Sequence, residues 1–162
     1  MILAASLFAA FRFSSEKRES VRAVGDMAAL LELLSSELAL KASPLPELID
    51  FAEQNSSGAA KRLLSNVLLQ LSRLGEMTFS EIWTRGVQAC CGQLLREDRD
   101  MLRSLGQVLG RLALREQLQA LDHCTRIFRS RQEELRRSLP STVRMVFGLC
   151  VSCGLLLSIL LY

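Results

Sequence analysis

Apolar side chains recur at intervals of three and four along most of the chain, which is the spacing of one face of an α-helix. No stretch alternates apolar and polar residues for long enough to predict a strand. The pattern therefore predicts an all-α fold, an antiparallel bundle of five or six helices with short connections. Residues 17–42 show the pattern most clearly, with apolar side chains at Val21, Val24, Met27 or Ala28, Leu31, Leu34 and Leu38.

Capping residues place the start and end of the next helices. Ser43 is expected to cap a second helix, with Pro44 in the first turn, where a missing N–H needs no partner. This helix stops at the Asn-Ser-Ser-Gly run of residues 55–58. A third helix then covers residues 59–74, with Gly75 as its C-cap.

Thr78 and Glu81 predict the start of a fourth helix, because a threonine and a glutamate at this spacing form a capping box. This helix ends near Gly92. The same apolar spacing predicts a fifth helix from about residue 94 to residue 110 and a sixth over residues 113–139.

The C-terminus carries the strongest membrane signal. Residues 145–162 hold no charged side chain, and as a helix they span roughly 27 Å, close to the roughly 30 Å hydrocarbon core of a bilayer. We expect a C-terminal transmembrane helix here, the alternative being a buried core helix. Pro140 either separates it from the sixth helix or kinks one long helix.

The N-terminal apolar run, residues 1–11, is short for a membrane span. A secretory signal requires a basic residue before its apolar run, and no basic residue precedes this one. A partial membrane anchor and an interfacial helix tip both fit it. The expected organisation is a short apolar segment (1–13), a helical bundle (14–139) and a transmembrane helix (140–162).

Basic residues lie at the end of each apolar run that adjoins the bundle, after residues 1–11 and before residues 145–162. The positive-inside rule then places the bundle in the cytoplasm, the alternative being an arginine-rich solvated helix face. The whole chain carries 20 basic and 17 acidic residues, a formal charge of +3 that does not suggest a nucleic-acid binder. The flanking residues are Arg12, Lys17, Arg18 and Arg22 after the first run, and Arg126, Arg129, Arg131, Arg136, Arg137 and Arg144 before the second.

The sequence holds no phosphate-binding loop and no zinc-binding pattern, so we expect no enzyme activity, no cofactor and no metal. Cys150 and Cys153 have the spacing of a metal or redox pair but lie in the apolar tail, where small residues suit helix packing. Two alternatives remain open. One is a self-associating helical scaffold, and the other is a small membrane-bound thiol or redox protein that uses Cys90, Cys91, His123 and Cys124.

Two features of the fifth helix have a structural and a functional interpretation. The acidic cluster Glu97, Asp98 and Asp100 alternates with arginines and is expected to form a solvated, salt-bridged face. Gly106 and Gly110 lie four residues apart, and glycine costs about 1 kcal/mol inside a helix. Close approach of a partner helix would explain both. Tight internal packing at Gly106 with a C-cap at Gly110 is the preferred interpretation.

Four passages in order resemble the stage III sporulation protein AB family of endospore-forming bacteria, over roughly residues 16–162. They are Leu31, Leu34, Glu37 and Leu38 followed by Ser43-Pro44-Leu45; the single Trp83; Leu105-Gly106, Leu109-Gly110 and Gln117; and the apolar tail with Gly148 and Gly154.

The resemblance implies a non-enzymatic component of a sporulation channel assembly in the mother-cell membrane around the forespore. The bundle would resemble the helical domain of type II secretion protein F, face the cytoplasm and dock a secretion-type ATPase to membrane subunits. The expected partners are that ATPase, other channel subunits and membrane lipid, with no nucleic acid and no small-molecule substrate. The candidate partner contacts are Glu37, Pro44, Gly106, Gly110, Arg111 and Gln117.

Overall fold

The computed structural model describes the backbone of residues 2–72, 75–109 and 111–160, and the side chains of residues 18–72, 75–109 and 111–137. These residues form six helices and no strand, which confirms the predicted all-α fold. The helices are α1 (Ile2–Lys41), α2 (Leu45–Gln54), α3 (Gly58–Leu71), α4 (Phe79–Cys90), α5 (Arg96–Val108) and α6 (Leu114–Leu160).

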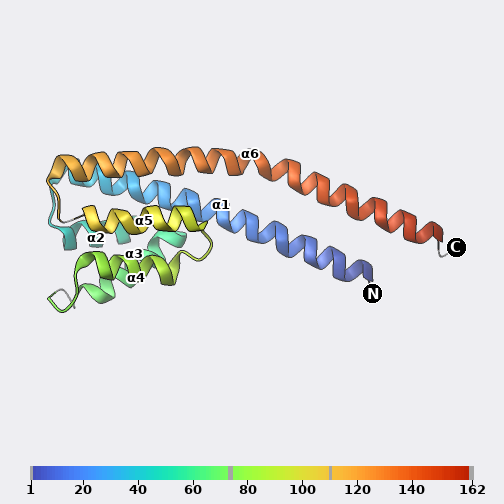
Figure 1. The fold of residues 1–162 in the computed structure, drawn as a ribbon, viewed down its shortest axis with the longest axis horizontal. Helices are drawn as coiled ribbons and strands as arrows, with labels where there is room; N and C mark the ends of the chain where they lie inside the picture. Colours follow the sequence, from blue (N-terminus) through green and yellow to red (C-terminus); the bar gives the residue numbers. More distant parts are fainter. Residues whose placement is uncertain (1, 73–74, 110, 161–162) are drawn as a thin grey trace.

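Helices α1 and α6 form a long antiparallel pair, and the four short helices pack against only one half of it (Figure 1). The other halves of α1 and α6 extend past the bundle, so that both chain ends lie at the same end of the molecule (Figure 1). We call that end of the bundle proximal and the opposite end, where α1 ends and α6 begins, distal.

The apolar stripe predicted for residues 17–42 is the face that α1 buries. Each fully buried leucine or valine contributes about 1.5–3 kcal/mol relative to exposure, so this stripe is the main attachment of α1. Outside the apolar contact, the guanidinium of Arg129 donates from Nε to Glu32 Oε1 at 2.7 Å. The buried side chains are Val24, Met27, Leu31 and Leu34 from α1, and Leu121, Cys124 and Phe128 from α6.

Trp83 is the centre of the packing between α4 and α5. Its indole is fully buried and donates from Nε1 to the carbonyl of Leu102 at 2.6 Å. Gly106 lies directly against the ring, because a Cβ at that position would be 2.5 Å from Trp83 Cδ1. The internal-packing interpretation of Gly106 is therefore confirmed.

The capping box at the start of α4 is confirmed. Glu81 N–H donates to Thr78 Oγ1 at 3.3 Å, and Thr78 N–H donates to Glu81 Oε2 at 2.8 Å. These two bonds satisfy amide groups that the first turn of a helix leaves without an intrahelical acceptor.

Two other predicted caps are wrong. Pro44, not Ser43, is the N-cap of α2, because the helix begins one residue later, and no side chain caps it. Helix α3 ends at Leu71 with Ser72 as its C-cap, so Gly75 lies beyond the helix. Gly75 still needs its lack of a side chain, since its φ is +120° in the following turn.

The long helices continue through both expected domain boundaries. Helix α1 begins at Ile2 rather than near residue 17, and α6 passes through Pro140 as one helix. Within residues 18–72, 75–109 and 111–137, no helix is both long enough and apolar enough to cross a bilayer. The predicted transmembrane helix over residues 145–162 thus gains no support from the structure, and its side chains lie outside the described residues.

Candidate functional site

The distal end carries a pocket of about 280 Å³ where α1 ends and where α2 and α6 begin. Four leucines and Ala42 line it together with polar groups, so its wall is of mixed character. Residues 38–48, at the end of α1 and the start of α2, form one part of the lining, and the start of α6 adds the other part from far along the sequence, so no local pattern predicts the whole pocket. We call this set the distal pocket: Leu38, Ala42, Ser43, Leu45, Leu48, Leu114 and Gln117.

Leucines also lie exposed at the edge of the distal pocket. Leu114 lines it and is 41% exposed, and Leu112, two residues earlier, is 45% exposed. The side-chain amide of Gln117 donates from Nε2 to the carbonyl of Leu112 at 2.7 Å, which fixes the turn before α6. Large exposed apolar side chains beside a pocket are typical of protein-binding surfaces.

Charges around the distal pocket are unevenly matched. Lys41 pairs with Glu37 at 2.8 Å and lies over the Phe51 ring. In contrast, Arg111 and Arg115 are exposed, and within the part of the chain whose side chains are described neither has an ion-pair partner.

The two exposed acids nearby, Glu47 and Glu116, lie in the first turns of α2 and α6. The positive N-terminal ends of those helices offset their charge. Among the described side chains at this end of the bundle, Arg111 and Arg115 therefore carry the unmatched charges.

The structure brings three of the expected contact residues to the distal end. Gln117 lines the pocket, Pro44 lies between two lining residues, and Arg111 is exposed in the turn before α6. Glu37 is in the same region but is buried and paired with Lys41.

The other two expected contact residues lie elsewhere or cannot be placed. Gly106 is buried against the core tryptophan, which leaves it no surface to offer a partner. Gly110 lies outside the described residues.

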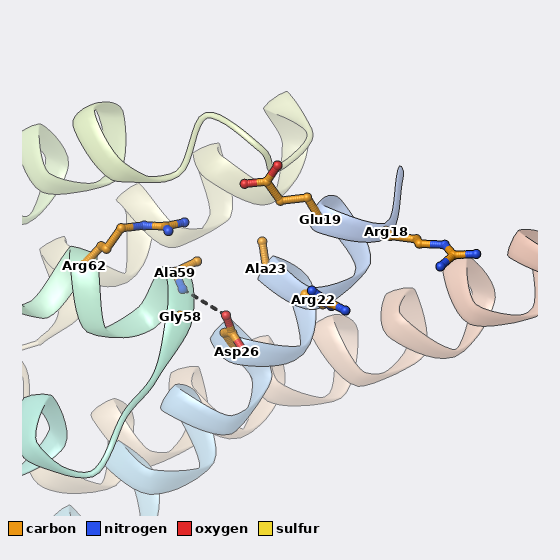
Figure 2. Close-up of a pocket in the computed structure, with 8 residues that line it drawn as sticks. All are labelled: Arg18, Glu19, Arg22, Ala23, Asp26, Gly58, Ala59 and Arg62. Carbon is orange, nitrogen blue, oxygen red and sulfur yellow. Dashed lines mark hydrogen bonds between the residues drawn. The ribbon is translucent and has the colours of Figure 1, made fainter. Parts of the chain in front are cut away.

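A second hollow, of about 440 Å³, lies at the proximal end between α1 and the start of α3. Its charged side chains do not converge: Arg62 and Glu19 lie on one side of Ala23, whereas Arg18 points away (Figure 2). At its base, Asp26 Oδ2 accepts the N–H of Ala59 at 2.9 Å and so caps α3. Both acidic and basic side chains line the hollow, so it does not form an anion-binding site.

The comparisons with known proteins agree with this architecture. The sequence model for stage III sporulation protein AB matches residues 1–162. The chain belongs to this family. The chain of a solved stage III sporulation protein AB has the same fold, with a TM-score of 0.66 at 16% identity, over 75% of this chain and 97% of that one. The sequence matches none of the curated proteins compared with it.

In this member of the stage III sporulation protein AB family, the acidic cluster on α5 is not wholly the solvated face that we expected. Asp98 is only 2% exposed, and the Arg131 guanidinium from α6 lies 3.5 Å from its Oδ1. Burial raises the pKa of Asp98 above its ordinary value, and Arg131 partly opposes this effect. The expectation is wrong for Asp98, because its side chain points between α5 and α6, but it is confirmed for Asp100, which pairs with Arg103.

The cysteines of the bundle are poorly placed for thiol chemistry. Burial raises the pKa of Cys91 to about 12 and also raises the pKa of Cys90 and Cys124. A thiol is a nucleophile or a metal ligand only as the thiolate, so the raised pKa values lower the reactivity of these thiols at neutral pH. His123 is exposed, whereas its neighbour Cys124 is buried.

Among the side chains that the structure describes, no three His, Cys, Asp or Glu residues could share a metal ion. Cys150 and Cys153 lie outside the described residues. The thiol or redox alternative therefore has no supporting geometry in the bundle.

Proposed function

We propose that this protein is a non-enzymatic, membrane-anchored adaptor of a sporulation-specific channel assembly. It docks a cytoplasmic secretion-type ATPase to membrane subunits at the mother-cell membrane around the forespore. Membership of the stage III sporulation protein AB family is the observation that carries the proposal. The adaptor role adds a physical mechanism, which is attachment at one end of the bundle and docking at the other.

The arrangement of the long helices supports attachment at the proximal end. The halves of α1 and α6 that extend past the bundle point the same way (Figure 1). The uncharged residues 145–162 and the apolar residues 1–11 belong to those two halves, and arginines precede the first and follow the second. A bundle held by residues 145–162 faces the arginine-rich side of the bilayer, which is the cytoplasm.

The distal end supports the docking role. The distal pocket is separated from the N-terminal apolar run by roughly 40 Å of α1, at about 1.5 Å per residue, so it lies beyond the lipid headgroups. Its exposed leucines and unmatched arginines are free to meet a protein from solution.

Membrane fractionation of three full-length or truncated forms tests the attachment. We expect the intact chain to stay in the membrane pellet after a high-salt wash and a chain lacking residues 145–162 to be released. A chain lacking residues 2–11 is the matched control and should stay in the pellet. Retention of the C-terminal truncation after the wash would contradict the proposed anchor.

Purified intact protein in detergent tests the docking. We expect it to retain the purified secretion-type ATPase on an affinity resin. Absence of retention at micromolar concentrations of both proteins would overturn the adaptor role, whatever the fractionation shows.

A further inference from the structure

We infer that the distal pocket is the docking socket for a partner segment that presents a leucine-sized apolar side chain next to carboxylates. This inference rests on the proposed function, because it assigns a face of the bundle to the cytoplasmic partner. The socket comprises the distal pocket and the side chains of Leu112, Arg111 and Arg115 beside it.

The size and lining of the pocket fit an amino-acid side chain. Small-molecule sites usually exceed about 300 Å³ and carry several converging polar groups. The distal pocket has about 280 Å³, and among its lining side chains only Ser43 and Gln117 are polar. Gln117 already uses its side-chain amide to hold the carbonyl of Leu112. The four lining leucines therefore favour an apolar side chain as the occupant.

The charges around the pocket select an acidic segment. Arg111 and Arg115 are the unmatched charges described above, and they lie on either side of the exposed Leu112 and Leu114 in the sequence. A carboxylate next to the inserted apolar side chain would gain from these guanidinium groups.

The chain's own apolar ends are poorly placed to fill the socket. Both chain ends lie at the opposite end of the molecule (Figure 1). A second copy held in the same membrane would present its own distal end in the same direction, so two sockets could not face each other. The occupant is therefore a separate cytoplasmic protein.

Binding of the purified secretion-type ATPase to the intact protein tests the socket. Leu112→Glu and Arg115→Glu each place a carboxylate where the partner is expected to bring one, so we expect each to weaken binding at least tenfold. Leu112→Met keeps an apolar side chain and should bind within about twofold of the unchanged protein. Leu95→Glu is the matched control, since Leu95 is 50% exposed but is the N-cap of α5, which begins at the proximal end (Figure 1), and it should also bind normally.

The outcomes separate the socket from the proposed function. If the unchanged protein binds the ATPase and the Leu112→Glu and Arg115→Glu variants bind equally well, the socket is wrong and the adaptor role stands. If the unchanged protein does not bind, the adaptor role fails and the socket fails with it. Sedimentation of the same proteins without the ATPase tests whether a second copy of the chain fills the socket. A dimer that Leu112→Glu dissociates would overturn the inference. Circular dichroism melts should superimpose, because the substituted side chains are exposed.

Discussion

Asp26 on α1 caps α3, because its Oδ2 accepts the N–H of Ala59 across a separation of 33 residues. Ser57 is the N-cap residue of α3, yet its own side chain makes no capping bond. The neighbouring Gly58 has φ +58°, and any Cβ there would collide with the Asp26 carboxylate. The contact therefore fixes both the start of α3 and its position against α1.

Replacing this capping acceptor should destabilise the bundle. Asp26→Ala leaves the Ala59 amide without its acceptor and should lower the free energy of unfolding by about 1–2 kcal/mol. Asp26→Asn keeps an oxygen acceptor and should restore most of the loss. Urea titration followed by circular dichroism measures both. Asp50→Ala is the control, since Asp50 accepts only an exposed bond from Gln54, and its effect should stay within about 0.5 kcal/mol.

The contact between Gly106 and Trp83 makes a second prediction. Gly106→Ala would raise helix propensity by about 1 kcal/mol, but its Cβ would meet the indole at 2.5 Å. The overpacking should prevail, because the ring is buried and is held by its bond to Leu102, giving a net loss of about 1–3 kcal/mol. Gly92→Ala is the control, since nothing lies within 4 Å of its Cβ position. A stabilised Gly106→Ala variant in a thermal melt would show that the ring yields.

The sequence pattern predicts the helices well because their burial is periodic. The stripe from Val24 to Leu34 is buried as expected, and the Thr78–Glu81 capping box forms because both of its bonds are local. Helix starts that depend on distant residues are predicted less well. The cap of α3 comes from Asp26, and a local reading of residues 55–58 holds no signal for it.

The candidate site was predictable only in part, for the same reason. Gln117, Pro44 and Arg111 were expected as partner contacts from a family resemblance, and they do lie at one end of the bundle. The distal pocket itself joins α1, α2 and α6, so its leucines looked like ordinary core positions in their separate helices. Leu112 is the one local signal, as a leucine in a turn where a polar residue is usual.

The buried Asp98 predicts a pH dependence of stability. Its folded-state pKa is raised above the value of 3.8 that it has when exposed. The folded state therefore holds this proton more tightly, so the contribution of Asp98 to stability is full below about pH 3.8. It is lost as the pH rises through the raised pKa. Relative to Asp98→Asn, the unchanged protein should become progressively less stable over that window.

The measurement is the difference in unfolding free energy between the two proteins from pH 3 to pH 7. Taking the difference removes Glu32 and Glu81, whose lowered pKa values give the opposite trend, with stability lost as the pH falls below 4.5. A difference for Asp98→Asn that grows in favour of the unchanged protein with rising pH would mean that Arg131 outweighs burial.

The raised pKa of Cys91, at about 12, predicts that this thiol resists alkylation while the bundle is folded. At pH 8 only about one molecule in 10,000 would carry the reactive thiolate, and the side chain is fully buried as well. We expect iodoacetamide to label Cys90, because this side chain is partly exposed, but to label it slowly, because its pKa is raised. Cys91 should be labelled readily only in urea, and peptide mass spectrometry distinguishes the two sites. In the absence of urea, global unfolding sets the labelling rate, so Asp26→Ala should accelerate it about tenfold for each 1.4 kcal/mol of stability that it loses. Rapid labelling of Cys91 in the folded protein would instead reveal an accessible thiolate and reopen the thiol-chemistry alternative.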